Sequence, residues 1–160
     1  MLDKFDLNIL SALQKNGRLS NKELAESIGL STAPCWRRLK HLEDEGYIKG
    51  YTAELNAKKV HLNVIAFAQV SMDNHHTETL TPFLSIVNDC PEIQECHSVS
   101  GDCDFMLKII TRDLDSYDEL LSKKLLQAKG VRSVNTMFSM KQPKISREFP
   151  LSTLLITEHS

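Results

Sequence analysis

The spacing of apolar residues changes once along this chain, close to residue 64. Up to residue 48, apolar side chains recur every three or four positions, which is the period of an amphipathic helix. After residue 64, stretches with alternating apolar residues are separated by two further helical stretches. The 160 residues therefore predict two small domains, a helical one followed by an α+β one.

Capping and stop signals divide the first part of the chain into three helices. Asp3 can cap the first helix, and Asn16-Gly17 can end it. Ser20 and Glu23 have the spacing of a capping box, in which each side chain bonds the other residue's amide. The remaining signals are Gly29-Leu30 as a tight turn, Ser31 or Thr32 as the third N-cap, Pro34 in the third helix's first turn and Gly46 at its end.

Two helices joined by a short glycine-containing turn, preceded by a bracing helix, have the geometry of a helix-turn-helix. Residues 46–55 (GYIKGYTAEL) then alternate in polarity, so we expect a β-hairpin or wing with Gly50 at its turn. The polar residues that follow resemble a connection. The sequence therefore predicts a winged helix-turn-helix domain over residues 1–52 and a linker over residues 53–63.

From residue 64 the expected elements follow the order βαββαβ. This order is typical of a ferredoxin-like domain, an antiparallel sheet with both helices on one face. The expected strands are 64–72, 93–100, 104–111 and 131–140, and the expected helices are 77–88 and one that Asp113 caps and Gly130 ends. Pro82 favours a start of the first of these helices nearer Thr79. We predict this domain over residues 64–144 and a tail over residues 145–160.

Both faces of the predicted sheet carry apolar side chains, yet two helices can cover only one face. On one side are Val64, Ala66, Ala68 and Val70 with Phe105, Leu107 and Ile109, and on the other are Ile65 and Phe67 with Met106 and Ile110. We expect the second face to meet the same sheet of another subunit, which makes the chain a homo-oligomer. The alternative is a monomer whose tail covers this face with Leu151, Leu154, Leu155 and Ile156.

The third predicted helix is the candidate for reading double-stranded DNA. It contains no acidic residue between Ser31 and Leu42, and its first turn is small enough to enter a major groove about 12 Å wide. Arg37 can bind guanine through two hydrogen bonds, while Arg38 and Lys40 are expected at phosphates or base edges. The expected DNA surface comprises Thr32, Ala33, Arg37, Arg38, Lys40 and His41, with Lys49 and Tyr51 of the wing at the DNA backbone. The alternative is a plain three-helix bundle with a solvated basic face.

Two neighbours of this basic surface have their own predictions. For Trp36 we favour a partly buried packing role over stacking against DNA. The acidic run 43–45 would repel phosphate, so this end of the helix is expected to point away from DNA. Within it, Asp44 can pair with Lys40 at a spacing of four residues.

A second candidate site lies in the stretch Ser98-Val-Ser-Gly-Asp-Cys-Asp104, after a predicted strand. Asp102 or Asp104 can hold a ligand ammonium, and exposed turn amides can hold its carboxylate, which suits an amino acid. The alternative is a hairpin in which Gly101 and Asp102 only make the turn.

Several function classes lack their sequence signature. No apolar run reaches about 18 residues, and the acidic N-terminus is unlike a signal peptide, so we expect a cytoplasmic protein without membrane contact. The four cysteines lack zinc-ligand spacing, and the six histidines form no catalytic or metal-binding group; solvation is expected for His75-His76. We expect no enzyme activity, metal or cofactor. The formal charge is +2 over residues 1–60 (ten basic, eight acidic) and −4 over residues 61–160 (nine basic, thirteen acidic).

The sequence resembles the Lrp/AsnC family of feast/famine regulators from about residue 2 to residue 144. The resemblance rests on LDKFDLNILSALQKNGRLSNKELAESIGLS, APCWRRLKHLEDEGYIKGYTAELN, IQECHSVSGDCDFMLKI and GVRSVNTMFSMK. It implies a winged helix-turn-helix joined to a ferredoxin-like regulatory domain. It also implies dimers formed between sheets, further assembly often to octamers, and amino acids or related metabolites bound between dimers.

Matched motif by motif, the resemblance places the helix-turn-helix at Asn21–Lys40, which adds Asn21 and Ser31 to the expected DNA surface. It places the effector cleft at Ser98, Gly101, Asp102, Asp104, Leu114, Met137, Phe138 and Ser139. The chain departs from many relatives at Ala33, Trp36 and Cys103, so neither a DNA target nor an effector carries over.

The sequence thus predicts a sequence-specific DNA-binding transcriptional regulator modulated by an amino acid or related metabolite. Paired half-sites about 34–36 Å apart are expected for a dimer. One alternative is a DNA-binding or architectural regulator without a small ligand. The other is an amino-acid-binding allosteric module of a metabolic enzyme, since βαββαβ domains occur in both settings.

Overall fold

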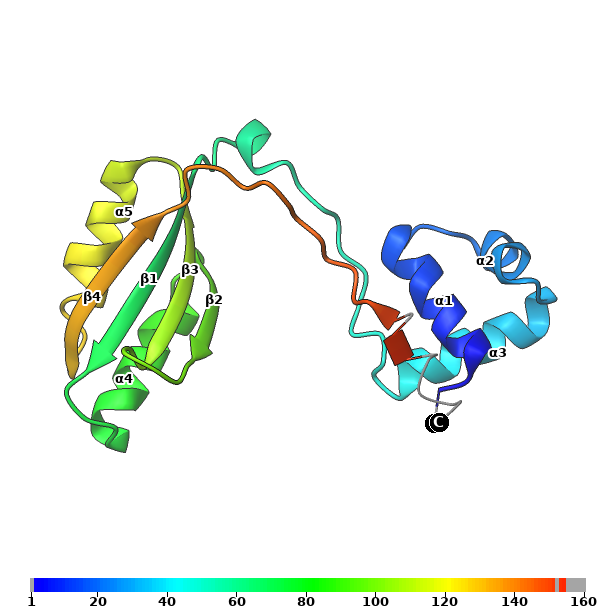
Figure 1. The fold of residues 1–160 in the computed structure, drawn as a ribbon, viewed down its shortest axis with the longest axis horizontal. Helices are drawn as coiled ribbons and strands as arrows, with labels where there is room; N and C mark the ends of the chain where they lie inside the picture. Colours follow the sequence, from blue (N-terminus) through cyan, green and yellow to red (C-terminus); the bar gives the residue numbers. More distant parts are fainter. Residues whose placement is uncertain (1, 152, 155–160) are drawn as a thin grey trace. The chain divides into compact units, whose positions relative to one another are not determined.

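The computed structural model describes residues 2–151, 153 and 154. These residues divide into two compact units, each with its own apolar core. The first unit contains the chain up to Glu54 together with the tail from Lys144, and the second runs from Leu55 to Pro143. The two units are labelled by their helices and strands in Figure 1.

Helices α1 (Lys4–Lys15), α2 (Asn21–Ile28) and α3 (Thr32–Asp44) form the first unit. The N-caps predicted for α1 and α2 are confirmed. The Asp3 carboxylate accepts hydrogen bonds from the amides of Phe5 and Asp6, and the Asp6 carboxylate accepts one from the amide of Asp3. Ser20 and Glu23 form the predicted capping box. Two local hydrogen-bond motifs therefore set where the first two helices begin.

The turn between α2 and α3 depends on Gly29, which has a left-handed φ of 72°. This conformation costs glycine little, and the next amide, that of Leu30, bonds back to the carbonyl of Ala25 at 3.0 Å. The buried core beneath the three helices consists of Ile9, Leu24, Ala25, Cys35 and Leu42. Helices, turn and core together confirm the predicted helix-turn-helix.

The prediction of a β-hairpin over residues 46–55 is wrong, because these residues contain no strand. The amide of Ile48 donates to the carbonyl of Leu42 at 3.2 Å, and Ile48 packs against the core of the first unit. The chain therefore folds back over the end of α3 before it runs on in an extended form. The alternating pattern reflects this packing against a helix and not pairing with a second strand.

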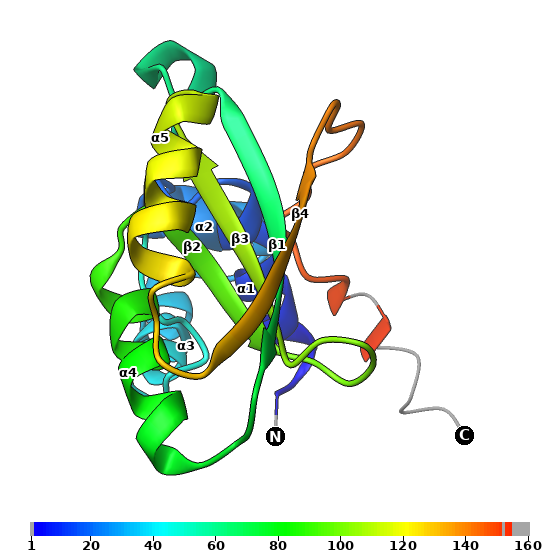
Figure 2. The ribbon, with the colours of Figure 1, turned by 90° about the vertical axis from the view of Figure 1, so that its left-hand side faces the viewer.

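The second unit is one antiparallel sheet in the strand order β2-β3-β1-β4, with two helices on one side of it (Figure 2). The elements are β1 (Val64–Met72), α4 (Thr77–Asp89), β2 (Ile93–Ser98), β3 (Phe105–Thr111), α5 (Leu114–Leu120) and β4 (Val131–Phe138). The βαββαβ order and the antiparallel sheet confirm the predicted ferredoxin-like fold.

The alternation predicted for the central strands is also observed. Ala66, Ala68 and Val70 of β1 and Leu107 and Ile109 of β3 are buried toward the helices. Their neighbours along the strands lie on the other face, where several apolar side chains remain partly exposed. This open face includes Ile65, Phe67, Met106, Ile110 and Met137.

Several boundaries differ from the prediction. Helix α4 begins at Thr77 and contains Pro82 within its length. Helix α5 continues as one π-helical turn, Leu121–Leu125. Gly130 has a φ of +86°, and a Cβ there would lie 2.6 Å from the Cβ of Thr79. Glycine is therefore required at this position both for its conformation and for the close approach of α4.

The tail after Lys144 contacts α1. The amide of Phe149 donates to Oε1 of Gln14 at 2.7 Å, and Nε2 of Gln14 donates to the carbonyl of Phe149 at 3.3 Å. The described tail residues thus belong to the first unit, which corrects the alternative in which the tail covers the sheet. Leu155 and Ile156, which that alternative also invoked, lie outside the described residues.

Candidate nucleic-acid interface and effector residues

One side of α3 faces solvent along most of its length. The buried side contains Cys35 and Leu42, and the helical period places a separate row of residues on the other side. We call this row the α3 stripe; its five members, Ala33, Trp36, Arg37, Lys40 and His41, are all at least partly exposed. The stripe carries two permanent positive charges and no carboxylate. Its charge therefore suits contact with phosphate and base edges.

The beginning of α3 is open as well. Ser31 occupies the N-cap position, but its hydroxyl makes no capping hydrogen bond in the described structure. Thr32 is exposed one residue later, and Asn21 is exposed at the start of α2. The first-turn amides of a helix have no intrahelical partner, so those of α3 can receive a phosphate oxygen.

Lys40 and Arg37 differ in their ties to the protein. Nζ of Lys40 lies 2.9 Å from Oδ1 of Asp44, as predicted, and this hydrogen bond raises the pKa of Lys40. Both side chains of the pair are more than half exposed, so water screens the attraction and a phosphate can replace Asp44. Arg37 forms no ion pair within the described part of the chain. Arg37 is therefore the stripe's uncommitted cation.

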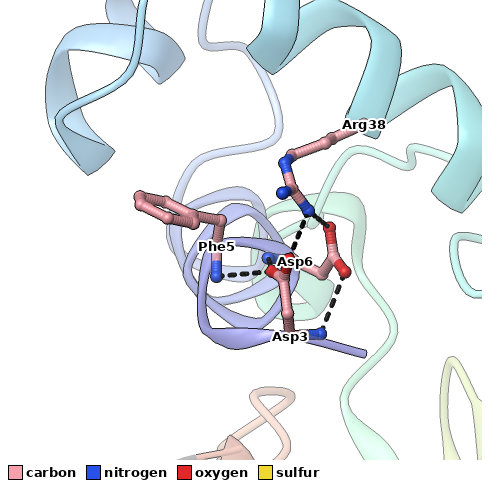
Figure 3. Close-up of polar contacts among 4 residues, drawn as sticks. All are labelled: Asp3, Phe5, Asp6 and Arg38. Atoms are coloured by element: carbon pink, nitrogen blue, oxygen red, sulfur yellow. Dashed lines mark hydrogen bonds and ion pairs between the residues drawn. The ribbon is translucent and has the colours of Figure 1, made fainter. Parts of the chain in front are cut away.

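The side chain of Arg38 lies on a different side of α3 from Arg37 and contacts the first turn of α1. Its Nη1 donates to Oδ2 of Asp3 at 2.7 Å and to Oδ1 of Asp6 at 2.8 Å (Figure 3). The ring of Phe5 lies beside the guanidinium, with its centroid 5.5 Å from Cζ. The hydrogen bonds that Arg38 donates, first the one to Asp6 and then the one to Asp3, raise the pKa of Arg38. These contacts argue against the assignment of Arg38 to phosphates or base edges, because the helical period turns it toward α1.

The surroundings of Tyr51 and Trp36 bear on the roles expected for them. The Tyr51 hydroxyl donates to Oε1 of Glu43 at 2.9 Å. Partial burial, followed by this contact with Glu43, raises the pKa of Tyr51 to about 12. A carboxylate at this position repels phosphate, so Tyr51 ties the extended segment to α3, while Lys49 nearby remains exposed. Trp36 is 50% exposed on the α3 stripe, which is more open than we expected for the partly buried packing role that we favoured.

The hairpin between β2 and β3 contains half of the predicted effector residues. Oδ2 of Asp104 accepts the amide of Met72 at 2.6 Å, and its Oδ1 lies 3.2 Å from Nε2 of His75. Both oxygens of Asp104 therefore bind the protein itself, which argues against its expected role as an ammonium ligand. Asp102 is exposed, beside a Gly101 with a φ of +125°. Asp102 is thus the available carboxylate of this loop.

The predicted effector residues lie at opposite ends of the sheet in one chain. Strand pairing aligns Ser98 with Phe105 and Val70, near the end of β1. Phe138 instead aligns with Ala66, near the start of β1, and contacts Tyr117 of α5 edge-on at 5.1 Å. The remaining members divide in the same way: Gly101, Asp102 and Asp104 lie beyond Ser98, whereas Leu114, Met137 and Ser139 lie close to Phe138.

The two rows, at Ala66 and Val70 of β1, are four residue steps apart, or roughly 13 Å along the strand. One chain therefore does not bring these residues into a single pocket. Phe138 also lies on the helix-covered face, whereas Met137 lies on the open face.

The sequence analysis missed Asp3 and Asp6 as the partners of Arg38. Their spacing of three places both on one side of α1, and this was a usable signal. Their partner Arg38 lies more than 30 positions away, and no local pattern indicates it. Among the described residues, no group of His, Cys, Asp and Glu is arranged to hold a metal ion. No helix of the described chain has the length and apolar character needed to cross a membrane.

Each of the two units matches a known protein family. Residues 2–49 match the family model of a winged helix-turn-helix DNA-binding domain, and residues 65–149 match that of the Lrp/AsnC ligand-binding domain. The leucine-responsive regulatory proteins of Escherichia coli K12 and Klebsiella pneumoniae are each 40% identical over 152 residues. These matches cover 95% of this chain and 93% of theirs.

Solved structures show the same similarity. A transcriptional regulator from Neisseria meningitidis, solved as its complex with L-Met, has a TM-score of 0.92 and 36% identity, covering 96% of this chain and 99% of its own. An AsnC family regulator from Agrobacterium tumefaciens has a TM-score of 0.90 and 34% identity, with the same coverage. With both units matched, this chain belongs to the Lrp/AsnC family of DNA-binding transcriptional regulators.

Proposed function

We propose that the α3 stripe of this regulator reads DNA and that an amino acid bound by the second unit modulates the reading. We further propose that the protein acts in the cytoplasm as a homo-oligomer. The observation that carries the DNA-reading role is the α3 stripe itself. There Arg37, which has no ion-pair partner among the described residues, lies beside Lys40 and opposite the buried face of the helix.

The DNA-reading role is tested with Arg37→Gln in the full chain. A duplex selected by the wild-type protein from a random pool serves as the probe, and affinity is measured over a range of salt concentrations. We expect the affinity to fall about tenfold or more, and the slope of log K against log salt to flatten by about 0.9 for each phosphate that is no longer neutralised. Lys129→Gln is the matched control, because it removes the charge of an exposed residue in the second unit. If Arg37→Gln left both the affinity and the salt slope unchanged, the DNA-reading role of α3 would be contradicted.

The effector role rests on two supports. The regulator from Neisseria meningitidis was solved with L-Met, and the exposed Asp102 of this chain offers a carboxylate to an amino acid's ammonium. Calorimetry with L-methionine and L-leucine tests the proposal, and Asp102→Asn is expected to weaken whichever binds. If none of the twenty amino acids bound, the regulator without a small ligand would be favoured instead.

The proposal of a homo-oligomer rests on the apolar side chains of the open face of the sheet. Phe67 and Met137 lie on paired strands and are 36% and 47% exposed, and the neighbouring Met106 and Ile110 are partly exposed. Apolar surface of this kind gains free energy when a second sheet covers it. Phe67→Glu is expected to reduce the sedimentation coefficient of the protein. A wild-type protein that sedimented as a monomer at micromolar concentration would contradict the proposal.

A further inference from the structure

We infer that Arg38 is a positioning residue, which sets the orientation of α3 against α1 for DNA recognition without touching DNA. The inference rests on the proposed DNA-reading role of α3. Its observation is the Arg38 cluster, defined as Arg38 with Asp3, Asp6 and Phe5 (Figure 3).

The two carboxylates are held in place by α1 itself. Asp3 uses one oxygen to accept the amides of Phe5 and Asp6, and Asp6 uses one oxygen to accept the amide of Asp3. The other oxygen of each carboxylate points to the same nitrogen of Arg38. The capping box thus offers Arg38 two fixed acceptors, whose positions follow the first turn of α1.

The partial burial of the cluster makes this contact favour one orientation of α3 over others. The Asp6 side chain is 11% exposed and that of Arg38 is 36% exposed. A largely buried carboxylate without its cation keeps an uncompensated charge, which is strongly unfavourable. Orientations of α3 that move Arg38 away from Asp6 are therefore disfavoured. Apolar packing between the helices lacks such directionality.

The charge of the cluster argues against DNA contact. One guanidinium and two carboxylates sum to −1, and a phosphate would have to compete with both carboxylates for Arg38. Arg37 and Lys40, in contrast, lie one residue before and two residues after Arg38, on the exposed side of the helix. A rotation of α3 at Arg38 therefore displaces both cations of the α3 stripe.

The experiment compares Asp6→Asn and Arg38→Gln with Asp44→Asn, all in the full chain and on the selected duplex used for Arg37→Gln. If Arg38 contacted DNA directly, Asp6→Asn would remove a negative charge, release Arg38 and preserve or raise the affinity. If Arg38 positions α3, Asp6→Asn and Arg38→Gln each lower the affinity for the selected duplex about tenfold, which is the size of one base-edge interaction. Their salt slopes should match wild type, because α3 takes the same orientation once it is bound, and the complex then neutralises the same number of phosphates. Asp44→Asn is the control, because it also removes an acidic side chain from α3. The affinity of this variant for the duplex is expected to be unchanged or higher.

The double variant Arg38→Gln, Asp6→Asn should bind no more weakly than Arg38→Gln alone, because both changes remove the same interaction. Asp3→Asn provides a second variant that keeps a good N-cap residue, so α1 is retained while one carboxylate charge is removed. Thermal unfolding of every variant establishes a temperature at which all are folded. Measurements at that temperature separate positioning from stability alone.

Three results would overturn the inference. They are wild-type affinity of Asp6→Asn at that temperature, a flattened salt slope in Arg38→Gln, and additive losses in the double variant. If Arg37→Gln flattened the slope while any of these occurred, only the role of Arg38 would fail. If Arg37→Gln had no effect, the DNA-reading role of α3 would fail first.

Discussion

The two units of this regulator assemble their candidate sites in opposite ways. In the first unit, one helix supplies the whole α3 stripe, and residues of the same unit hold that helix in place. In the second unit, the predicted effector residues fall into two groups at opposite ends of the sheet. A surface on one helix is complete in one chain. A set divided between the ends of a sheet can meet only if a second chain contributes one of the groups.

This difference bears on how the two activities depend on assembly. The orientation of α3 depends on short polar contacts inside the first unit, such as Arg38 with Asp6. An effector that bridges two chains changes the free energy of association, because it binds the assembled state more tightly than the separate chains. The open face of the sheet lies on the same unit as the divided effector residues. Effector binding and oligomerisation are therefore expected to be coupled, whereas a single unit's contact with DNA is not.

The largest expected effects come from the two cores. Leu42→Ala in the first unit and Leu107→Ala in the second should each lower the free energy of unfolding by about 2–5 kcal/mol, because both side chains are fully buried. Calorimetric unfolding should show the decrease in the unit that contains the change. Leu55→Ala, at a residue that is 70% exposed, is the control. A uniform shift of all transitions in both variants would show that the units unfold as one body and would break the comparison.

A smaller effect is expected at Gly130. Alanine there meets an unfavourable positive φ and approaches Thr79 too closely, which together should cost about 2–4 kcal/mol of unfolding free energy in the second unit. Gly101→Ala is the matched variant, because its φ is also positive but no atom lies within 4 Å of the added carbon. Urea unfolding followed by circular dichroism measures both. Equal decreases would show that backbone conformation alone matters at Gly130.

The division of the effector residues can be tested by mixing subunits. Asp102→Ala changes one group and Leu114→Ser the other. Each variant alone should bind L-methionine or L-leucine at least about tenfold more weakly, the effect expected when a polar or apolar contact that the ligand would bury is lost. In oligomers reassembled from both variants, about a quarter of the sites should combine two unchanged groups if each site takes one group from each chain. Calorimetry detects the restored sites. A mixture with no restored binding would mean that a single chain supplies the site.

The smallest effect is expected at Tyr51. Its folded pKa of about 12 lies above the ordinary value of 10, so the protonated hydroxyl stabilises the folded state. That stabilisation is fully present below pH 10 and is lost as the pH rises toward 12. Tyr51→Phe should lower the stability of the first unit by less than about 1 kcal/mol at neutral pH, since the contact with Glu43 is half exposed to solvent. Chemical denaturation at about pH 8 and about pH 11 should show a smaller pH dependence in the variant than in wild type.

Local sequence determined much of this protein. Asp3, Ser20 and Gly29 mark helix ends because their side chains or backbone bond to residues three or four positions away. Both partners of each interaction therefore lie within one short stretch of sequence. The alternation of β1 and β3 likewise follows from the geometry of a strand, and it predicted which residues form the core. The same locality placed Arg37 and Lys40 on one helix with no acid between them.

Tertiary structure alone decided which of these residues are available. Arg38 and Arg37 are adjacent basic residues, yet only Arg38 meets carboxylates within the described chain, because α1 packs against that side of α3. Residues 46–55 have a strand-like pattern but no strand partner in the part of the chain that the structure describes, since the end of α3 takes up their contacts. Asp104 and Asp102 are two residues apart, and the bend of the hairpin directs only Asp104 to Met72. The carboxylate partners of Arg38 and the Met72 partner of Asp104 lie more than 30 positions away, and the partners of residues 46–55 lie six and eight positions back on a helix end. Packing decides each of these pairings, and the local pattern of apolar and charged residues does not indicate them.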